Sequence, residues 1–397
     1  MVKNRLPLAA MLRKPIFSLI PRPRRVRKQD LSTVRTILVM RSGGLGDVVM
    51  STPMLEQLRK LFPRVEITYL TGRASAAVLS EPLVNDVIDF DDQIFIRKKI
   101  APALKLASRI RKRHFDLAFM LDKHWIFGLF ARLCRIPIII GFDRHGEGFL
   151  YNLAIPFTGS KYEGQYYCDL ARAVAIIKGV ELEGHNGINY PPPPLAVEGC
   201  KPILYPAKKD IIWADKTASE IRKFRLQRLI GIAPGGASNP GQEFALKRWP
   251  EERYLQLVKM LLDKGYAVAI FGSGRADLRV SRSIIGRLER NRSLVHDFTG
   301  RLSILQSTAL MKHCDLFITH DSGPTHLAAT QTKTIALFGP TPSRRFAPEN
   351  AIVIEKSLKC QPCYTLFGGF KKGCKRPACM RGISVEEVFD VAEGVLG

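Results

Sequence analysis

The stretch Thr36–Asp47, TILVMRSGGLGD, decides the fold class of this 397-residue chain. It opens with β-branched and apolar side chains, which predict a buried strand over Thr36–Met40. The strand leads directly into glycines, among them Gly44 and Gly46, which allow a tight turn before a helix whose free N–H groups can bind an anion. The spacing differs from the dinucleotide-binding fingerprint, because neither glycine is followed three residues on by Gly or Ala.

Similar apolar runs recur along the chain and alternate with stretches of helical period, which is typical of βαβ units and parallel sheets. We expect strands at Thr36–Met40, Glu66–Leu70, Val87–Phe90, Asp116–Leu121, Ile136–Gly141, Ile230–Ala233, Ala267–Phe271, Leu316–Thr319, Thr334–Phe338 and Ala351–Ile354. We expect helices at Met54–Phe62, Pro102–Lys112, Gly164–Ile177, Glu251–Lys264, Ala276–Leu288, Ser303–His313 and Pro324–Thr330. The pattern predicts an α/β protein with two doubly wound, Rossmann-like domains facing a central cleft.

A proline run separates the two halves. Residues Asn189–Pro194 read NYPPPP, a stiff segment that suits neither a helix nor a sheet interior. We therefore expect a basic N-terminal arm at 1–34, a first domain at 35–192 and a second domain at 193–397.

Small residues gather where the strands of the second half end. Gly235 and Ser238 follow one strand, Gly272 the next, and Asp321–Gly323 a third. Because the carboxyl ends of parallel strands meet at one edge of a sheet, these turns predict a ligand site there. Lys247, which follows the first turn, suits phosphate oxygens.

The segment Asp321–Ala329, DSGPTHLAA, opens a helix, since Pro324 suits the first helical position. Asp321 or Ser322 can cap this helix, and its free N–H groups would receive a diphosphate. A conventional capped helix explains the same residues equally well.

Asp47 has two interpretations. At the end of the first strand it faces the crevice that open α/β sheets use for ligands, where a carboxylate can act as a general base on an acceptor hydroxyl. Alternatively, it only complements the helix dipole, and the local sequence alone favours this second interpretation.

The formal net charge of +25 suggests an anionic partner. Up to residue 35 the chain carries ten basic residues and one acidic residue. Its apolar pieces are too short to span a membrane and do not resemble an export signal. The arm is either a weakly amphipathic segment resting on anionic lipid or a solvated tail, and the body is expected to be cytoplasmic. Nucleic acid is not expected as a partner, because the arm offers only Phe17 for stacking.

Taken together, the motifs resemble those of glycosyltransferase family 9, the heptosyltransferases of lipopolysaccharide core assembly. The resemblance rests on RSGGLGDVVMSTP at Arg41–Pro53, PGGAS at Pro234–Ser238, KRWP at Lys247–Pro250, DSGPTHLAA at Asp321–Ala329 and LFGPTP at Leu337–Pro342. It runs from about residue 35 to the end of the chain, and the basic arm lies outside it.

This resemblance implies a GT-B fold in which the first domain holds the acceptor and the second holds a nucleotide-sugar. It further implies inverting transfer of heptose from ADP-heptose to a lipopolysaccharide-core or related anionic glycolipid, without a catalytic metal, at the inner membrane. By position, Asp47 matches the catalytic base and Lys247 a lysine on the donor diphosphate. The donor-binding loop corresponds to Asp321, Ser322, Gly323, Thr325 and His326, and Asp277 is the nearest candidate for a ribose contact.

Half of the eight cysteines fall in one segment, at Cys360, Cys363, Cys374 and Cys379. Two close pairs can supply four thiolates to a structural zinc or iron ion, and reduced thiols or a redox-sensitive disulfide are the alternatives. The other four, at Cys134, Cys168, Cys200 and Cys314, are expected to be separate core thiols.

Two further classes of function compete with glycosyl transfer. One is a nucleotide-sugar epimerase of the same fold, which would act without an acceptor. The other is a non-catalytic basic protein that binds membrane or nucleic acid.

Overall fold

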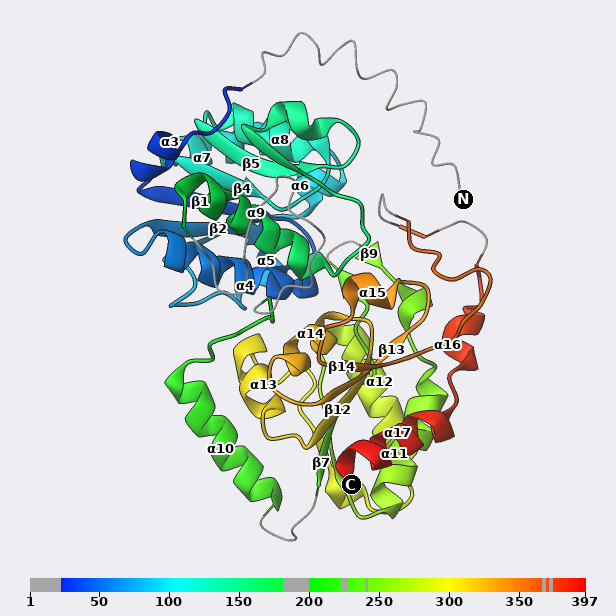
Figure 1. Ribbon diagram of the computed structural model, residues 1–397. Helices are drawn as coiled ribbons and strands as arrows, with labels where there is room; N and C mark the ends of the chain where they lie inside the picture. The colour runs from blue at the N-terminus through cyan, green and yellow to red at the C-terminus, as the bar shows by residue number, and fades with distance from the viewer. Residues whose placement is uncertain (1–22, 181–199, 223–227, 240–241, 366–368, 371–373) are drawn as a thin grey trace.

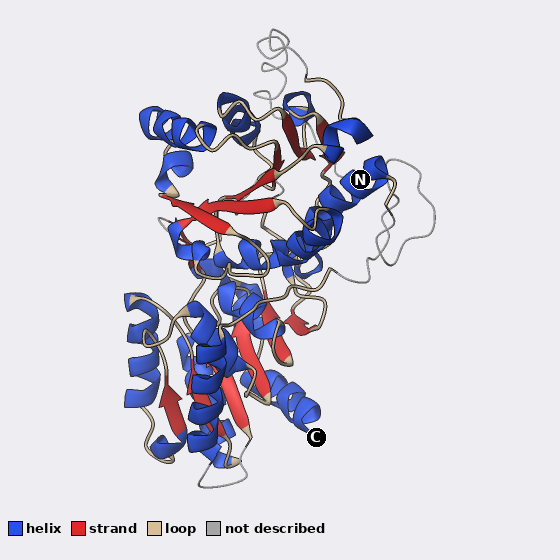
Figure 2. Ribbon diagram, turned by 90° about the vertical axis from the view of Figure 1, so that its left-hand side faces the viewer, coloured by secondary structure: helices blue, strands red, loops and turns tan. Residues whose placement is uncertain are grey.

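The computed structural model describes residues 23–180, 200–222, 228–239, 242–365, 369–370 and 374–397. Each half of the chain builds a six-stranded parallel sheet with helices on both faces (Figures 1 and 2). The first sheet consists of β1 (Thr36–Arg41), β2 (Glu66–Gly72), β3 (Asp86–Phe90), β4 (Leu117–Met120), β5 (Ile138–Asp143) and β6 (Leu153–Pro156). The second consists of β7 (Leu229–Ala233), β10 (Ala267–Ile270), β11 (Val295–Asp297), β12 (Leu316–His320), β13 (Thr334–Phe338) and β14 (Ala351–Glu355).

The strand orders are β3-β2-β1-β4-β5-β6 and β11-β10-β7-β12-β13-β14. Counted within its own half, each sheet has the order 3-2-1-4-5-6 of the doubly wound Rossmann fold. In such a sheet the chain reverses direction of travel between strands 1 and 4, and the crevice there binds ligands. The expected fold class is thus confirmed, and the crevices must lie beyond β1 and β4 and beyond β7 and β12.

In the first half the helices are α3 (Lys28–Ser32), α4 (Leu45–Leu61), α5 (Arg73–Ala76), α6 (Gln93–Ile96), α7 (Ile100–Arg111), α8 (Trp125–Leu133) and α9 (Glu163–Lys178). Strand β1 shows how they are distributed, because successive side chains point to opposite faces of a strand. Ile37 and Val39 pack with residues of α4 and α9. Leu38 and Met40 pack with residues of α7 and α8 on the other face.

Helix α4 is longer than expected from the sequence. The expected helix began at Met54, after Pro53, whereas α4 already begins at Leu45 and contains Pro53. Proline cannot donate the hydrogen bond to the carbonyl four residues earlier. Here the Thr52 hydroxyl donates to that carbonyl, on Val49, at 2.9 Å, and this local replacement lets the helix continue.

In the second half the helices are α10 (Lys208–Arg222), α11 (Glu251–Asp263), α12 (Arg275–Gly286), α13 (Ile304–Met311), α14 (Gly323–Ala329), α15 (Ser343–Phe346), α16 (Ala378–Gly382) and α17 (Val385–Leu396). A two-stranded hairpin pairs β8 (Ser238–Asn239) with β9 (Gln242–Glu243). Helix α14 packs on α4 of the first half, so the two halves meet through the helices that follow β1 and β12 (Figure 1).

The chain passes from one half to the other just before α10. Ile203 donates its N–H to Thr52 Oγ1 at 2.9 Å, and the Tyr205 hydroxyl donates to Glu56 at 2.9 Å. The first half therefore holds the chain as far as Tyr205, and α10 then packs on α13 of the second half. The expected boundary at residues 189–194 lies outside the described residues and stays a prediction.

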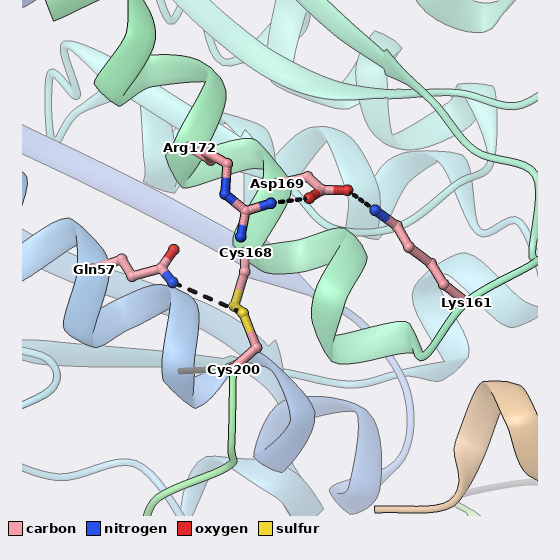
Figure 3. Close-up of a disulfide and its surroundings, with 6 residues drawn as sticks. All are labelled: Gln57, Lys161, Cys168, Asp169, Arg172 and Cys200. Carbon is pink, nitrogen blue, oxygen red and sulfur yellow. Dashed lines mark hydrogen bonds and ion pairs between the residues drawn. A yellow bond between two sulfur atoms is a disulfide. The ribbon is translucent and has the colours of Figure 1, made fainter. Parts of the chain in front are cut away.

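One expectation about the cysteines was wrong. Cys168 on α9 and Cys200 form a disulfide, with their Cα atoms 6.5 Å apart, and are not separate thiols (Figure 3). Both side chains are buried, and Gln57 of α4 contacts the Cys200 sulfur. The two residues meet because the chain returns to α9 after the segment 181–199. Cys134 and Cys314 are free and buried, as expected.

Most of the expected basic arm lies outside the described residues, which begin at residue 23. In the part that is described, α3 buries Leu31 in the first core. None of the helices within the described ranges is long and apolar enough to cross a membrane.

Candidate functional site

A cleft opens between the two halves, beyond the carboxyl ends of both sheets. Its first wall comes from Arg41, Gly44, Gly46, Asp47, Met50 and Glu163. Its second wall comes from Ala237, Ser238, Phe244, Lys247, Asp321, Ser322, Gly323, His326, Arg345, Phe346 and Tyr364. The turns after β1, β7 and β12 all reach it, so the crevices of both Rossmann-like sheets open into one space.

On the first wall, Asp47 lies in the first turn of α4 and pairs with Arg41, whose Nη2 is 2.9 Å from Asp47 Oδ1. Arg41 is itself fixed by Tyr167, whose hydroxyl accepts from Nε at 3.0 Å, and by an ion pair with the buried Asp122. Burial lowers the pKa of Arg41, but Asp47, Tyr167 and Asp122 outweigh it and the pKa stands well above its ordinary value. Arg41 is therefore a permanent cation that orients one oxygen of Asp47.

On the second wall, Lys247 pairs with Asp321, with Nζ 2.8 Å from Oδ2. Thr341 also donates a hydrogen bond to Asp321 Oδ2. Burial raises the pKa of Asp321, but Lys247 and these hydrogen bonds lower it further, so the net shift is downward. The carboxylate is thus ionised, and Lys247 is held by it at the mouth of the crevice beside β12.

Three aromatic rings surround the Lys247 ammonium. Nζ lies 5.6 Å from the ring centroid of Phe244 and 5.9 Å from those of Phe346 and Tyr364. Rings at this distance attract a cation and exclude water from it. An anion that reached Lys247 here would be bound in a partly dry environment, where electrostatic attraction is stronger than in bulk water.

The two walls pack tightly against each other at Gly46 and His326. A Cβ added at Gly46 would lie 2.5 Å from His326 Cδ2, so only glycine allows this contact. Burial lowers the pKa of His326, against the opposing effects of Asp321 and Asp47. His326 is therefore a neutral imidazole between the two carboxylates.

A second link crosses the cleft through Glu163, at the start of α9, whose side chain is 2% exposed. Glu163 forms an ion pair with Lys123 of the first half, and Arg345 of α15 donates to Glu163 Oε2 at 2.9 Å. Burial raises the pKa of Glu163, but Lys123 and Arg345 lower it further, to about 2. The two halves are thus joined by a buried carboxylate held between two cations.

The remaining residues that the sequence predicted to contact the nucleotide-sugar lie behind the cleft wall. Thr325 is buried and donates to the His320 carbonyl at 2.7 Å, which caps the turn before α14. Asp277 accepts hydrogen bonds from the backbone N–H groups of Gly236, at 2.8 Å, and Ser273, at 2.7 Å. It joins the turns after β7 and β10.

Gly235 and Gly272 are packed against the same aspartate. A Cβ on Gly235 would lie 2.3 Å from Asp277 Oδ1, and one on Gly272 would lie 2.8 Å from Asp277 Cβ. These two glycines make room for a carboxylate that shapes the wall, and their direct contact with a donor stays a prediction.

The four-cysteine metal site is not supported. Cys363 and Cys379 are buried, whereas Cys360 and Cys374 are exposed. Across the described ranges, no group of three or more His, Cys, Asp or Glu side chains is placed to hold a metal ion. The expected site depended on a loop, and parts of that loop, 366–368 and 371–373, lie outside those ranges.

Glu163, Lys123 and Arg345 were not predicted from the sequence. No motif surrounds them, and Glu163 and Arg345 are 182 residues apart. Arg41 was visible in the glycine-rich motif, and its position directly before the turn was the one signal that could have pointed to a role beside Asp47.

Comparison with known proteins adds the family. The sequence profile of "Glycosyltransferase family 9 (heptosyltransferase)" matches residues 103–368, more than half of the chain. The lipooligosaccharide heptosyltransferase 2 of Campylobacter jejuni is 33% identical over 165 residues, which cover 40% of this chain and 50% of that protein. The match thus spans about half the length of that relative. The lipopolysaccharide heptosyltransferase 2 of Salmonella typhimurium is 26% identical over 79% of this chain and 84% of its own.

Solved structures agree on the fold. The ADP-heptose lipopolysaccharide heptosyltransferase II of Escherichia coli is 22% identical, with a TM-score of 0.68 over 91% of this chain and 98% of that one. A family 9 glycosyltransferase from Veillonella parvula is also 22% identical, with a TM-score of 0.69 over 94% and 99%. Neither competing class of function, epimerase or non-catalytic binding protein, gains support from these matches. The chain belongs to glycosyltransferase family 9, the heptosyltransferases, and has their two-domain GT-B fold.

Proposed function

We propose that the protein is an inverting glycosyltransferase that transfers heptose from ADP-heptose to an anionic glycolipid of the lipopolysaccharide-core type. The observation that carries the proposal is the cleft itself. It places Asp47 on one wall and the Lys247–Asp321 pair on the other, each at the carboxyl edge of its own Rossmann-like sheet. Family membership and the heptosyltransferase names of the relatives support the choice of sugar and acceptor.

In the proposed reaction, an acceptor hydroxyl attacks the anomeric carbon of the donor sugar. A new C–O bond forms there with inversion, the bond from that carbon to the diphosphate breaks, and the hydroxyl proton passes to Asp47. Arg41 holds Asp47 Oδ1, which leaves Oδ2 for the proton. ADP leaves as an anion.

The leaving diphosphate develops charge next to the second wall. Lys247 and the N–H groups at the start of α14 meet that charge, and such preorganised groups stabilise the transition state more than the ground state. The proposal assigns no step to a metal ion. The neutral His326 and the small residues Ser238 and Gly323 complete the donor side.

The test compares the parent with Asp47→Asn in heptose transfer from ADP-heptose to heptose-deficient lipopolysaccharide. Removing a general base is expected to lower kcat by about 100- to 10,000-fold, with donor affinity by calorimetry nearly unchanged. Asp91→Asn, at an exposed carboxylate outside the cleft lining, is the matched control. Equal transfer by Asp47→Asn and the parent would show that Asp47 is not the base.

A donor screen tests the sugar. Parent protein titrated with ADP-heptose, UDP-glucose and UDP-N-acetylglucosamine is expected to bind the first most tightly. If it binds none of them, the glycosyltransferase assignment of this site fails.

We also propose a cellular location for the protein. A basic arm at 1–34 and an anionic lipid-linked acceptor together suggest a peripheral protein on the cytoplasmic face of the inner membrane. Replacing Arg22, Arg24, Arg25, Arg27 and Lys28 with Gln is expected to weaken binding to anionic vesicles. If these substitutions leave vesicle binding unchanged, the arm is a solvated tail that does not contact lipid.

A further inference from the structure

An unusual group of apolar side chains lies exposed on the first half. Ile96 on α6 is 42% exposed, and Ile100 and Leu104 on α7 are 75% and 51% exposed. Ile100 and Leu104 are four residues apart in a helix and therefore share a face. Within the described part of the chain no segment covers them, and the two helices are held from beneath by Phe95, which packs on Phe90, Phe127 and Phe130.

The same surface is strongly basic. From residue 93 to residue 115 the chain has eight basic residues and no acidic one. All eight are exposed: Arg97, Lys98, Lys99, Lys105, Arg109, Arg111, Lys112 and Arg113. We call Ile96, Ile100, Leu104 and the cations Arg97, Lys98, Lys99, Lys105 and Arg109 the α6–α7 surface.

Lys98 and Lys99 do not stabilise helix α7, which they directly precede. Lys99 is the N-cap of α7, and the first turn of the helix contains no acidic residue. Positive charge at a helix N-terminus opposes the helix dipole. Among the described residues, Lys98, Lys99 and Lys105 form no ion pair. Two unpaired cations at the unfavourable end of the helix and a third, Lys105, in its middle lie beside exposed isoleucine and leucine. This combination indicates a partner outside the protein.

The surface is also well placed relative to the cleft. Helices α6 and α7 follow β3, so the start of α7 lies at the carboxyl edge of the first sheet, the edge from which Asp47 and Arg41 reach the cleft. Helices α4 and α9 cover the face of the first sheet that meets the second half, and α6 and α7 cover the opposite face. In Figure 1 α7 and α8 accordingly lie at the top of the molecule, away from the lower half.

We propose that the α6–α7 surface is a docking site for an anionic lipid bilayer. Ile100 and Leu104 enter the boundary between headgroups and acyl chains, and the surrounding cations bind lipid phosphates. Interfacial helices combine these two contributions, buried apolar area and attraction to anionic headgroups. A protein partner would have to match an apolar centre with a dense acidic rim, and the chain's own N-terminal arm is itself basic and cannot supply that charge.

This docking is independent of the proposed heptosyl transfer, because it requires lipid and not a donor. It would bring the acceptor edge of the first sheet next to the bilayer, where a lipid-linked acceptor is presented. Binding to vesicles and transfer to an acceptor can therefore succeed or fail separately.

The experiment measures co-sedimentation of the full-length chain with vesicles of phosphatidylcholine alone and with 30% phosphatidylglycerol, at about the ionic strength of a cell. The first variant combines Ile100→Glu with Leu104→Glu, and the second combines Lys98→Gln with Lys99→Gln. Ile212→Glu is the matched control, since Ile212 is 58% exposed on α10 of the second half, whose charges are mixed.

The first variant is expected to bind anionic vesicles at least about tenfold more weakly than the parent. The second is expected to lose about fivefold for each cation removed, and only on vesicles that contain phosphatidylglycerol. Ile212→Glu is expected to bind like the parent. The basic arm is present in every protein and contributes equally to all of them.

The proposal is overturned if the Ile100/Leu104 variant binds anionic vesicles as the parent does, or if Ile212→Glu weakens binding equally. Parent binding to neither type of vesicle, with capture of an acidic protein instead, would assign the surface to a protein partner. Circular dichroism checks that each variant is folded. Transfer to a detergent-free, delipidated acceptor separates docking from catalysis, because both variants should retain it.

Discussion

The buried carboxylate of Glu163 gives the sharpest test of how the two halves hold together. It pairs with Lys123 in the first half and Arg345 in the second, and its side chain is 2% exposed. Glu163→Gln keeps the shape and removes the charge. Two buried cations then lose the counter-charge that they share.

The size of the effect follows from burial. Removing one partner of a buried ion pair costs about 3–5 kcal/mol. Lys123 makes part of this loss depend on pH. Its pKa is lowered from 10.5 to about 8 by burial, against the opposing effect of Glu163, so without Glu163 it falls further and Lys123 loses its proton. Because this pKa is already about 8 in the parent, deprotonation of Lys123 in the variant adds up to about 1.4 kcal/mol to the loss at pH 7.

Urea unfolding of parent and variant at pH 6, 7 and 8 measures this loss. Below about pH 8, Lys123 of the parent is protonated both folded and unfolded, so it adds no pH dependence. In the variant only the unfolded chain binds that proton. The variant's stability therefore rises with pH, and the difference in unfolding free energy between parent and variant narrows by up to about 1.4 kcal/mol per pH unit.

The matched control is Glu252→Gln, which removes an exposed ion pair with Arg287 and is expected to change little. A loss below about 1 kcal/mol for Glu163→Gln, or a gap that does not change with pH, would refute the buried-triad explanation of the contact between the halves.

Three further predictions follow from packing, protonation and covalent linkage. Gly46→Ala places a methyl group 2.5 Å from His326 Cδ2, so we expect the free energy of unfolding to fall by about 1–3 kcal/mol and donor binding to weaken. The control is Gly286→Ala, whose added methyl group meets no atom within 4 Å. In thermal denaturation this control should be neutral or stabilising. Burial lowers the pKa of His320 from 6.5 to about 3. The neutral His320 therefore contributes stability that is fully present above pH 6.5 and is lost as the pH falls toward 3. His320→Asn should remove this contribution to the fall of the unfolding free energy in acid. Cys168→Ser opens a disulfide between residues 32 apart in sequence, and urea unfolding under non-reducing conditions should show a loss of about 3–4 kcal/mol.

The sequence predicted the sheets well because their strands are buried on both faces. Runs such as Ile335–Phe338 are continuously apolar, and a parallel strand covered on both sides needs little more information. The short edge strand β6 was missed, since four residues ending in Pro156 carry a weak pattern. Helix α10 was also missed, because its charged and apolar residues are mixed and its stability comes from packing on α13.

The site residues also fall into those that the sequence predicted and those that it did not. Asp47, Lys247 and Asp321 were predicted from the sequence and do line the cleft, because each belongs to a short motif with glycine or proline that follows a strand. Their roles stay predictions. Glu163 and Arg345 could not be found, because their role arises only when the two halves meet. The Cys168–Cys200 bond was likewise set by the return of the chain to α9, which no spacing of cysteines predicts.

The attachment of residues 200–205 to the first half has a mechanical consequence. A disulfide and the hydrogen bonds of Ile203 and Tyr205 fix this segment, so only Pro206 and Ala207 lie between it and α10. Such a short joint cannot lengthen, and the halves cannot simply separate. Opening of the cleft must instead be a rotation of one half about the joint near Pro206, and such a rotation has to break the buried Glu163–Arg345 contact wherever it pulls α9 away from α15.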